Sequence, residues 1–194
     1  YSSDQLQPII SDRVGLAFKE GAVPEATISF LADVAGSSGD ARYAIELLWR
    51  AGKYADLESS SLVSAEYVRK AIASVYPAMR TDYIAALSIH EKLLLLALSR
   101  LLIERDVAYV SMGEVEREYQ AACDEFSEEP RQHTQVWKYA RALSSIGIIS
   151  AQKSGEGMRG RTTLLGLAQV PASTMQESLQ AALETARKGP RKYS

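Results

Sequence analysis

The chain has 194 residues, of which 46% are hydrophobic and 24% charged, a composition typical of a globular protein with one large domain or two small ones. Its longest apolar run, Leu93 to Leu98, is too short to span a bilayer and nothing resembles a signal peptide, so we expect a cytoplasmic protein with no membrane partner. The formal net charge is −2, so attraction to nucleic acid has to come from a local basic segment, and the single cysteine, Cys123, allows no internal disulfide.

The first eighty residues read as a run of short helices with no strand pattern between them. Four helices are predicted from capping residues and a first-turn proline: Asp4 to Lys19, Pro24 to Ala35, Asp40 to Ala55 and Ser64 to Tyr76. In the third, Ala44, Leu47 and Ala51 share one face at helical spacing. This pattern predicts a helix that packs in the core of a small bundle.

A domain boundary is predicted between Tyr76 and Asp82, because the apolar pattern lapses there and proline disfavours helix in the residue before it. We therefore assign residues 1–80 to a helical domain and residues 81–172 to a second domain. Residues 173–194 are expected to form a C-terminal helix from Ser173 to Arg187 and a disordered basic tail.

Two capping boxes open the second domain. Ser88 to Glu91 begins a helix predicted to end near Glu104, and Ser111 to Glu114 begins one predicted to end near Phe126. Residues 111–130 carry seven carboxylates and one arginine, for a local charge of −6. A solvated acidic face is the simplest interpretation, and a docking face for a basic partner is the alternative.

The segment from Pro130 to Ala168 is the most informative about function. A helix from Thr134 to Ile146 is followed by two β-rich runs, Ile148 to Lys153 and Arg161 to Leu167, which a glycine-rich loop joins. A helix that leads into a basic hairpin is typical of a winged helix-turn-helix, in which the helix enters a major groove and the hairpin reaches the backbone. Residues 131–166 contain six cations and one carboxylate, for a local charge of +5.

The residue types in this segment suit contact with DNA. Val136, Ala140 and Leu143 form an inner stripe of the helix, which leaves polar and cationic side chains on the other side. In the hairpin, a glycine between two arginines permits close approach to phosphates. The candidate DNA-binding residues are Arg131, Gln132, Thr134, Gln135, Lys138, Arg141, Lys153, Arg159, Gly160, Arg161 and Thr162. An ordinary solvated face and hairpin is the alternative, and Trp137 and Tyr139 are expected in the core.

Residues 38–52, Ser-Gly-Asp-Ala-Arg-Tyr-Ala-Ile-Glu-Leu-Leu-Trp-Arg-Ala-Gly, resemble the sensor-two helix of the AAA+ lid in archaeal replication initiators of the origin-recognition and cell-division-control type. The segment Leu143 to Ile149 and the later Gly160-Arg-Thr162 resemble the C-terminal domain of that family. The resemblance covers essentially the whole chain. It implies a mainly α fold, with a small helical bundle as the AAA+ lid and then a winged helix-turn-helix domain with a β-hairpin wing.

The resemblance also implies a nucleotide site in the intact protein. Tyr1 and Arg13 would border the adenine and phosphates, and Arg42 would reach the γ-phosphate of ATP from the lid. This sequence has no Gly-x4-Gly-Lys-Ser/Thr phosphate loop and no acidic magnesium-binding strand, so we expect the ATPase core upstream of Tyr1. ATP or ADP with magnesium is therefore expected in the intact protein, whereas this chain alone is expected to bind no cofactor and to have no enzymatic activity.

The expected partners are double-stranded origin DNA and, by the resemblance, the replicative helicase. Two other readings of the same residues stay open: a winged-helix transcription regulator with a sensing or dimerising bundle, and a winged helix that binds an acidic protein. A metal site is not expected, because His133 precedes the helix from Thr134, while His90 and Cys123 fall on two other predicted helices.

Overall fold

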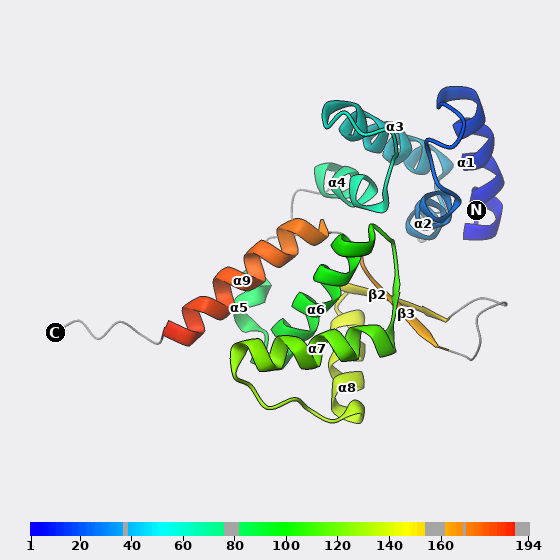
Figure 1. The fold of residues 1–194 in the computed structure, drawn as a ribbon. Helices are drawn as coiled ribbons and strands as arrows, with labels where there is room; N and C mark the ends of the chain where they lie inside the picture. The colour runs from blue at the N-terminus through cyan, green and yellow to red at the C-terminus, as the bar shows by residue number, and fades with distance from the viewer. Residues whose placement is uncertain (37–38, 76–81, 154–161, 169, 189–194) are drawn as a thin grey trace. The chain divides into compact units, whose positions relative to one another are not determined.

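The computed structural model describes residues 1–36, 39–75, 82–153, 162–168 and 170–188. These residues form mainly helices with one small sheet, which confirms the predicted mainly α class (Figure 1). The chain divides into two compact units: unit 1 contains residues 1–77 and 106–108, and unit 2 contains residues 78–105 and 109–194.

Unit 1 is built on four helices: α1 (Ser3–Ala17), α2 (Glu25–Gly36), α3 (Ala41–Leu57) and α4 (Ala65–Val75). The predicted start of α1 at Asp4 is wrong, because Ser2 caps the helix in a capping box with Gln5. The predicted cap of α3 is confirmed, since the carboxylate of Asp40 accepts the backbone N–H of Arg42 at 2.8 Å.

The core of unit 1 is apolar around one buried cation. Large buried apolar side chains come from all four helices: Leu6 and Ile10 on α1, Phe30 and Leu31 on α2, Leu47 on α3, and Ile72 on α4. Arg69 of α4 is only 1% exposed, and its guanidinium lies 5.2 Å from the centre of the Phe30 ring. It pairs with Glu66 at 3.3 Å and donates to the carbonyls of Val107 and Ala108 at 3.1 and 2.9 Å, which satisfies a charge that is costly to bury alone.

Unit 2 is organised around α6 (Ile89–Arg105), which contacts α7 (Met112–Phe126), α8 (His133–Ser145) and α9 (Ala172–Lys188). Its six consecutive residues from Leu93 to Leu98 are all buried. A helix that is apolar on every side has to be covered on every side, and the surrounding helices and β3 provide that cover. The short helix α5 (Asp82–Ala86), which lies against α9, was not predicted.

The sheet of unit 2 has three antiparallel strands in the order β1-β3-β2. Strands β2 (Ile149–Lys153) and β3 (Thr163–Leu167) form the predicted hairpin, and the register runs from Ile149 opposite Leu167 to Lys153 opposite Thr163. Strand β1 (Val110–Ser111) pairs with the other edge of β3 and was not predicted. The left-handed Gly147, with φ +76°, makes the turn between α8 and the hairpin.

The ends of two predicted elements shift in the structure. Helix α8 begins at His133 after the N-cap Gln132, one residue before the predicted Thr134. Helix α9 begins at Ala172, so Ser173 lies inside the helix and is not its cap. The tail predicted to be disordered runs from Lys188 to Ser194: Lys188 ends α9 in the structure, and residues 189–194 lie outside the described residues. None of the described helices combines the length and apolarity needed to cross a membrane.

Candidate nucleic-acid interface

Helix α8 presents one buried and one exposed face, as its sequence predicts. Val136, Ala140 and Leu143 are buried, with exposed fractions of 2% or less. The opposite face is exposed and carries four polar side chains: Thr134, Lys138, Arg141 and Ser145. The buried stripe orients the helix in unit 2, so two cations and two hydroxyls stand on a surface that a ligand can reach.

The two aromatic residues of α8 do not lie in the core, contrary to the prediction. Trp137 and Tyr139, expected in the core, are both partly exposed. Tyr139 stacks on His90, with ring centres 6.2 Å apart and planes inclined by 12°. Gln135, a candidate base-contacting residue, is also only partly exposed, whereas Lys138 and Arg141 are exposed.

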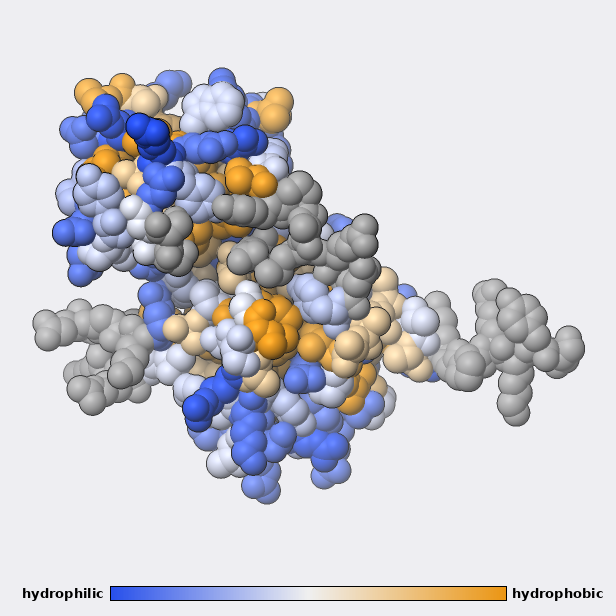
Figure 2. Space-filling model, turned by 180° about the vertical axis from the view of Figure 1, so that it is seen from behind, coloured by the Kyte–Doolittle hydropathy of each residue, from blue (hydrophilic) through white to orange (hydrophobic). Residues whose placement is uncertain are grey.

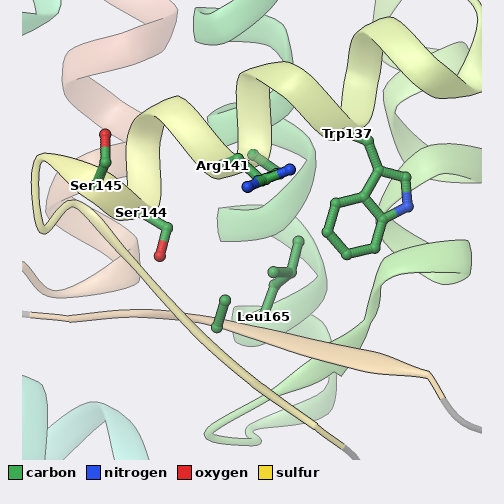
Figure 3. A pocket seen from close by; sticks show the side chains of 7 residues that line it. Trp137, Arg141, Ser144, Ser145 and Leu165 are labelled. Carbon is green, nitrogen blue, oxygen red and sulfur yellow. The ribbon is translucent and has the colours of Figure 1, made fainter.

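A pocket of about 250 Å³ lies between α8 and the β2–β3 hairpin, and we call it the α8–hairpin pocket. Its lining residues are Trp137, Ala140, Arg141, Ser144, Ser145, Ala151 and Leu165. Figure 3 shows Trp137, Arg141 and Ser144 on the side of α8 that faces the strands, with Leu165 of β3 across from them. Of these seven lining residues, only Arg141 was predicted from the sequence as a DNA-binding residue. The pocket itself depends on how the hairpin packs against the helix.

The connection from α7 to α8 carries Arg131 and Gln132, two further candidate residues. Both are exposed, and Gln132 makes no side-chain capping bond to α8. Figure 2 shows hydrophilic side chains gathered at the end of unit 2 where α7 and α8 are joined. A polar surface of this kind suits a hydrated, charged ligand.

Arg131 is anchored to a buried cluster in the interior of unit 2. Its backbone N–H donates to Tyr119 Oη at 3.2 Å, and its Nε donates to His90 Nε2 at 3.0 Å. His90 Nδ1 lies 2.8 Å from Tyr119 Oη. His90 is 4% exposed and Tyr119 is fully buried. This cluster was not predicted from the sequence.

Burial in this cluster shifts the pKa values of His90, Tyr119 and Cys123. Burial, and next the nearby Arg131 cation, lower the pKa of His90, while Glu128 acts in the opposite direction. Burial also raises the pKa of Tyr119 and of the neighbouring Cys123 thiol. Both therefore stay neutral at physiological pH, so the cluster is uncharged apart from Arg131.

In the hairpin, the structure describes only part of the candidate set. Lys153 ends β2 opposite Thr163, and Thr162 is partly exposed just before β3. Arg159, Gly160 and Arg161 lie outside the described residues. Their proposed contacts with DNA stay predictions from sequence.

Several carboxylates of the acidic helix α7 form side-chain contacts that its sequence does not indicate. Arg100 of α6 bonds Glu125 at 2.7 and 3.1 Å and lies 3.8 Å from Glu118. Arg105 pairs with Glu114, and His133 Nδ1 lies 2.7 Å from Glu116. These contacts join α7 to α6 and to the start of α8, so four of its carboxylates have a structural role.

The candidate nucleotide-site residues all lie on unit 1. Arg42 is exposed in the first turn of α3, and Arg13 is exposed on α1. Tyr1 is 65% exposed, and its amino group donates to the carbonyl of Gly39 at 3.0 Å, three residues before Arg42. The structure thus brings Tyr1 near the start of α3, and among the described residues no hydrogen bond or ion pair joins Arg13 to that pair.

The described residues contain no group of three or more His, Cys, Asp or Glu side chains placed to hold a metal ion. Cys123 is buried in α7, His90 is engaged with Tyr119 and Arg131, and His133 is engaged with Glu116. The exposed polar face of α8 beside the hairpin is therefore the strongest candidate site of unit 2.

Comparison with known proteins assigns a family to both halves of the chain. Residues 82–178 match the profile described as the CDC6 C-terminal winged helix domain, and residues 7–73 match the Cdc6 AAA+ ATPase-type lid domain. The ORC1-type DNA replication protein 2 of Sulfurisphaera tokodaii is 42% identical over 187 residues, a match that covers 92% of this chain and 44% of that protein.

Solved structures give the same result. The crystal structure of Cdc6p from Pyrobaculum aerophilum matches 95% of this chain and 48% of that one with a TM-score of 0.83 and 29% identity. The Aeropyrum pernix ORC2 protein, solved as ADPNP-ADP complexes, matches 98% of this chain and 48% of that one with a TM-score of 0.50 and 26% identity. The chain spans less than half the length of these relatives.

The two matched domains explain the fold: four helices of a lid in unit 1, and in unit 2 a helix followed by an antiparallel hairpin that is the wing of a winged helix. The sequence-based recognition and the fold class are therefore confirmed. The chain belongs to the Cdc6 family of AAA+ proteins, among the archaeal ORC1-type DNA replication proteins, and comprises the lid and the C-terminal winged-helix domain.

Proposed function

We propose that this chain is the origin-binding part of an archaeal replication initiator, and that it grips duplex DNA with α8 and the wing formed by β2 and β3. The observation that carries the proposal is the exposed face of α8, where Lys138 and Arg141 stand away from the buried stripe and Arg141 also lines the pocket beside the hairpin. A helix held in this way can enter a major groove while the wing follows the adjacent backbone.

The proposed contacts divide into two kinds. Arg141, Lys138 and Gln135 would reach base edges or phosphates from α8, and Arg131, Gln132 and Thr134 would meet the backbone at the start of the helix. Lys153, Arg159, Gly160, Arg161 and Thr162 of the hairpin would contact phosphates or the minor groove. We therefore expect α8 to set the sequence preference and the wing to add affinity.

Anisotropy of a fluorescein-labelled duplex, titrated with the 194-residue chain at several salt concentrations, tests the proposal. Neutralising four or five phosphates gives a slope of log affinity against log salt of about −4. The R159A/R161A variant should weaken binding to all sequences alike and reduce the slope by about 2, since each lost contact removes about 0.9. R141A should also change the preference among sequences.

Arg117→Ala is the matched control, because Arg117 is exposed on the acidic helix α7 and its loss changes the net charge by the same amount as R141A. We expect R117A to bind like the wild type. No binding to any duplex at low salt contradicts the proposal. Equal losses in R117A and R141A would show a general effect of charge instead of a site.

We also propose that the lid reports the nucleotide state in the intact protein, through Tyr1, Arg13 and Arg42 with ATP or ADP and magnesium. The exposed position of Arg42 at the start of α3 supports this, as does the nucleotide-bound form of the A. pernix relative. In the intact protein, R42A should reduce the difference in affinity between ATP and ADP. E46Q, an exposed change one turn later on α3, is the control.

A role in loading the replicative helicase completes the proposed function of the intact protein. The test is a loading assay with purified helicase, nucleotide and origin duplex. We expect the R159A/R161A protein to load less helicase than the wild type in proportion to its weaker DNA binding. Full loading by that variant would show that helicase loading does not depend on the DNA contacts of the wing.

A further inference from the structure

We infer that His90 and Tyr119 are positioning residues for DNA binding, which hold Arg131 in the orientation in which its guanidinium meets a backbone phosphate. This inference rests on the proposed DNA-binding function and deepens it. His90 and Tyr119 are buried, at 4% and 0% exposed, so neither is itself available to DNA. They act through Arg131, which is exposed in front of α8.

Two bonds fix Arg131 at two separate points. Tyr119 Oη accepts the backbone N–H at 3.2 Å, and His90 Nε2 accepts the Nε–H at 3.0 Å. The first bond holds the chain just before α8, and the second holds the long side chain. An arginine that is already ordered loses less conformational entropy on binding than a free one, so each phosphate contact is worth more.

The arrangement requires one tautomer of His90. Because Nε2 accepts from Arg131, the proton of the neutral ring has to be on Nδ1, and Nδ1–H then donates to Tyr119 Oη at 2.8 Å. Tyr119 Oη thus accepts two bonds, one from the backbone N–H of Arg131 and one from His90 Nδ1–H. Every donor in this chain of bonds has one acceptor.

Protonation of His90 breaks the anchor. A proton on Nε2 faces the Arg131 Nε–H, so two donors and two cations meet at 3.0 Å. The groups around the ring are Tyr119 and Cys123 from α7, Tyr139 from α8, and Glu128 and Arg131 from the connection between them. Of these only Glu128 favours the charged ring, while burial and Arg131 lower the pKa of His90.

The sign of the pH effect distinguishes this anchor from simple charge attraction. Protonating a histidine adds positive charge, which ordinarily strengthens binding to DNA. Here protonation releases Arg131, so affinity for duplex falls as pH is lowered through the pKa of His90, which lies below the ordinary histidine value of about 6.5. The chain has two histidines, so the variant H133Q leaves His90 as the one histidine that titrates.

The experiment measures anisotropy of a labelled duplex with the 194-residue chain in the H133Q background, from about pH 7.5 to about pH 5, a range that extends well below the ordinary histidine pKa of about 6.5 because the pKa of His90 is lowered. His90→Phe keeps a ring to stack on Tyr139 and removes the acceptor. We expect H90F and R131A each to lower affinity about fivefold at neutral pH, as for one charge-assisted contact. The double variant should lose no more than R131A alone, and H90F should lack the acid-induced loss.

A second measurement does not depend on the variants folding. The ring-nitrogen chemical shifts of His90 in the wild-type chain should show the Nδ1–H tautomer, and a predominant Nε2–H tautomer overturns the anchor. Additive losses in H90F and R131A, or tighter binding at acid pH in H133Q, overturn the positioning role. If the wild-type chain binds no duplex at all, the proposed function itself fails, and the tautomer still reports on the anchor separately.

Discussion

Arg131 Nε and His90 Nε2 lie 3.0 Å apart, although 41 residues separate them in the chain. The bond ties the connection before α8 to the first turn of α6, the central helix of unit 2. It is formed only with the neutral ring of His90. The stability of unit 2 therefore depends on the protonation state of a buried residue.

The free energy of unfolding should fall as pH is lowered from about 7 to about 5, since histidine titrates near 6.5 in the unfolded chain. The pKa of His90 is lowered in the folded state, so the unfolded state binds the proton more readily. Urea denaturation at each pH measures this slope. The H90F variant should show a shallower slope than the wild type over this range, and an unchanged slope contradicts the assignment.

The carboxylate of Glu114 should stabilise the start of α7 at neutral pH. Hydrogen bonds from the Ser111 hydroxyl, from Arg105 and from the Ser111 backbone lower its pKa to about 2. The contribution is present above the unfolded pKa of about 4.3 and is lost as pH falls from there towards 2.

Glu114→Gln keeps a capping-box side chain and removes the charge, so we expect a loss of about 1 kcal/mol at pH 7, discounted for partial exposure, that shrinks in acid. Thermal denaturation at two pH values compares E114Q with E129Q, a change at an exposed residue of the connection. A difference between the two variants that persists at the acid limit would mean that charge is not the cause.

Trp137 should report on DNA in the α8–hairpin pocket. It lines the pocket beside Arg141, and the other tryptophan, Trp49, lies in unit 1 with 59% exposure. In a W49F protein, emission therefore comes from Trp137 alone. We expect duplex to change its intensity or wavelength, because phosphates displace water near the ring. Binding seen by anisotropy without any change in emission would place DNA away from this pocket.

Replacing the buried Arg69 should destabilise unit 1 strongly. R69A leaves Glu66 and the carbonyls of Val107 and Ala108 without this donor, at an expected cost of about 3 kcal/mol in the free energy of unfolding. Arg50→Ala is the control, because Arg50 pairs with Glu46 in an exposed i,i+4 pair and its loss should cost about 0.5 kcal/mol. Chemical denaturation measures both, and equal losses contradict a special role for Arg69.

Local signals in the sequence predicted the helices of both units well. The caps at Asp40 and Ser111 are confirmed, because a capping residue and its partner lie within three positions of each other. Strand β1 could not be predicted in this way. It has two residues, and Val110 becomes a strand only through pairing with Leu165, more than fifty positions later.

In the candidate site, too, features set by local sequence were predicted and features set by distant contacts were not. The buried stripe of α8 follows from its own periodicity, so Lys138 and Arg141 were correctly placed on the exposed side. The anchoring of Arg131 by His90 and the pocket around Trp137 depend on contacts between elements distant in sequence. Such contacts become visible only when the helices and the hairpin are packed together.

The ion pairs along α7 have an electrical consequence. Arg100, Arg105 and His133 hold several carboxylates of α7 in place, whereas α8 displays Lys138 and Arg141 outward. Helix α7 therefore carries an excess of carboxylates while α8 displays cations, so charge is unevenly distributed over unit 2. An approaching duplex would orient unit 2 before contact, so that few encounters would begin at the acidic surface of α7.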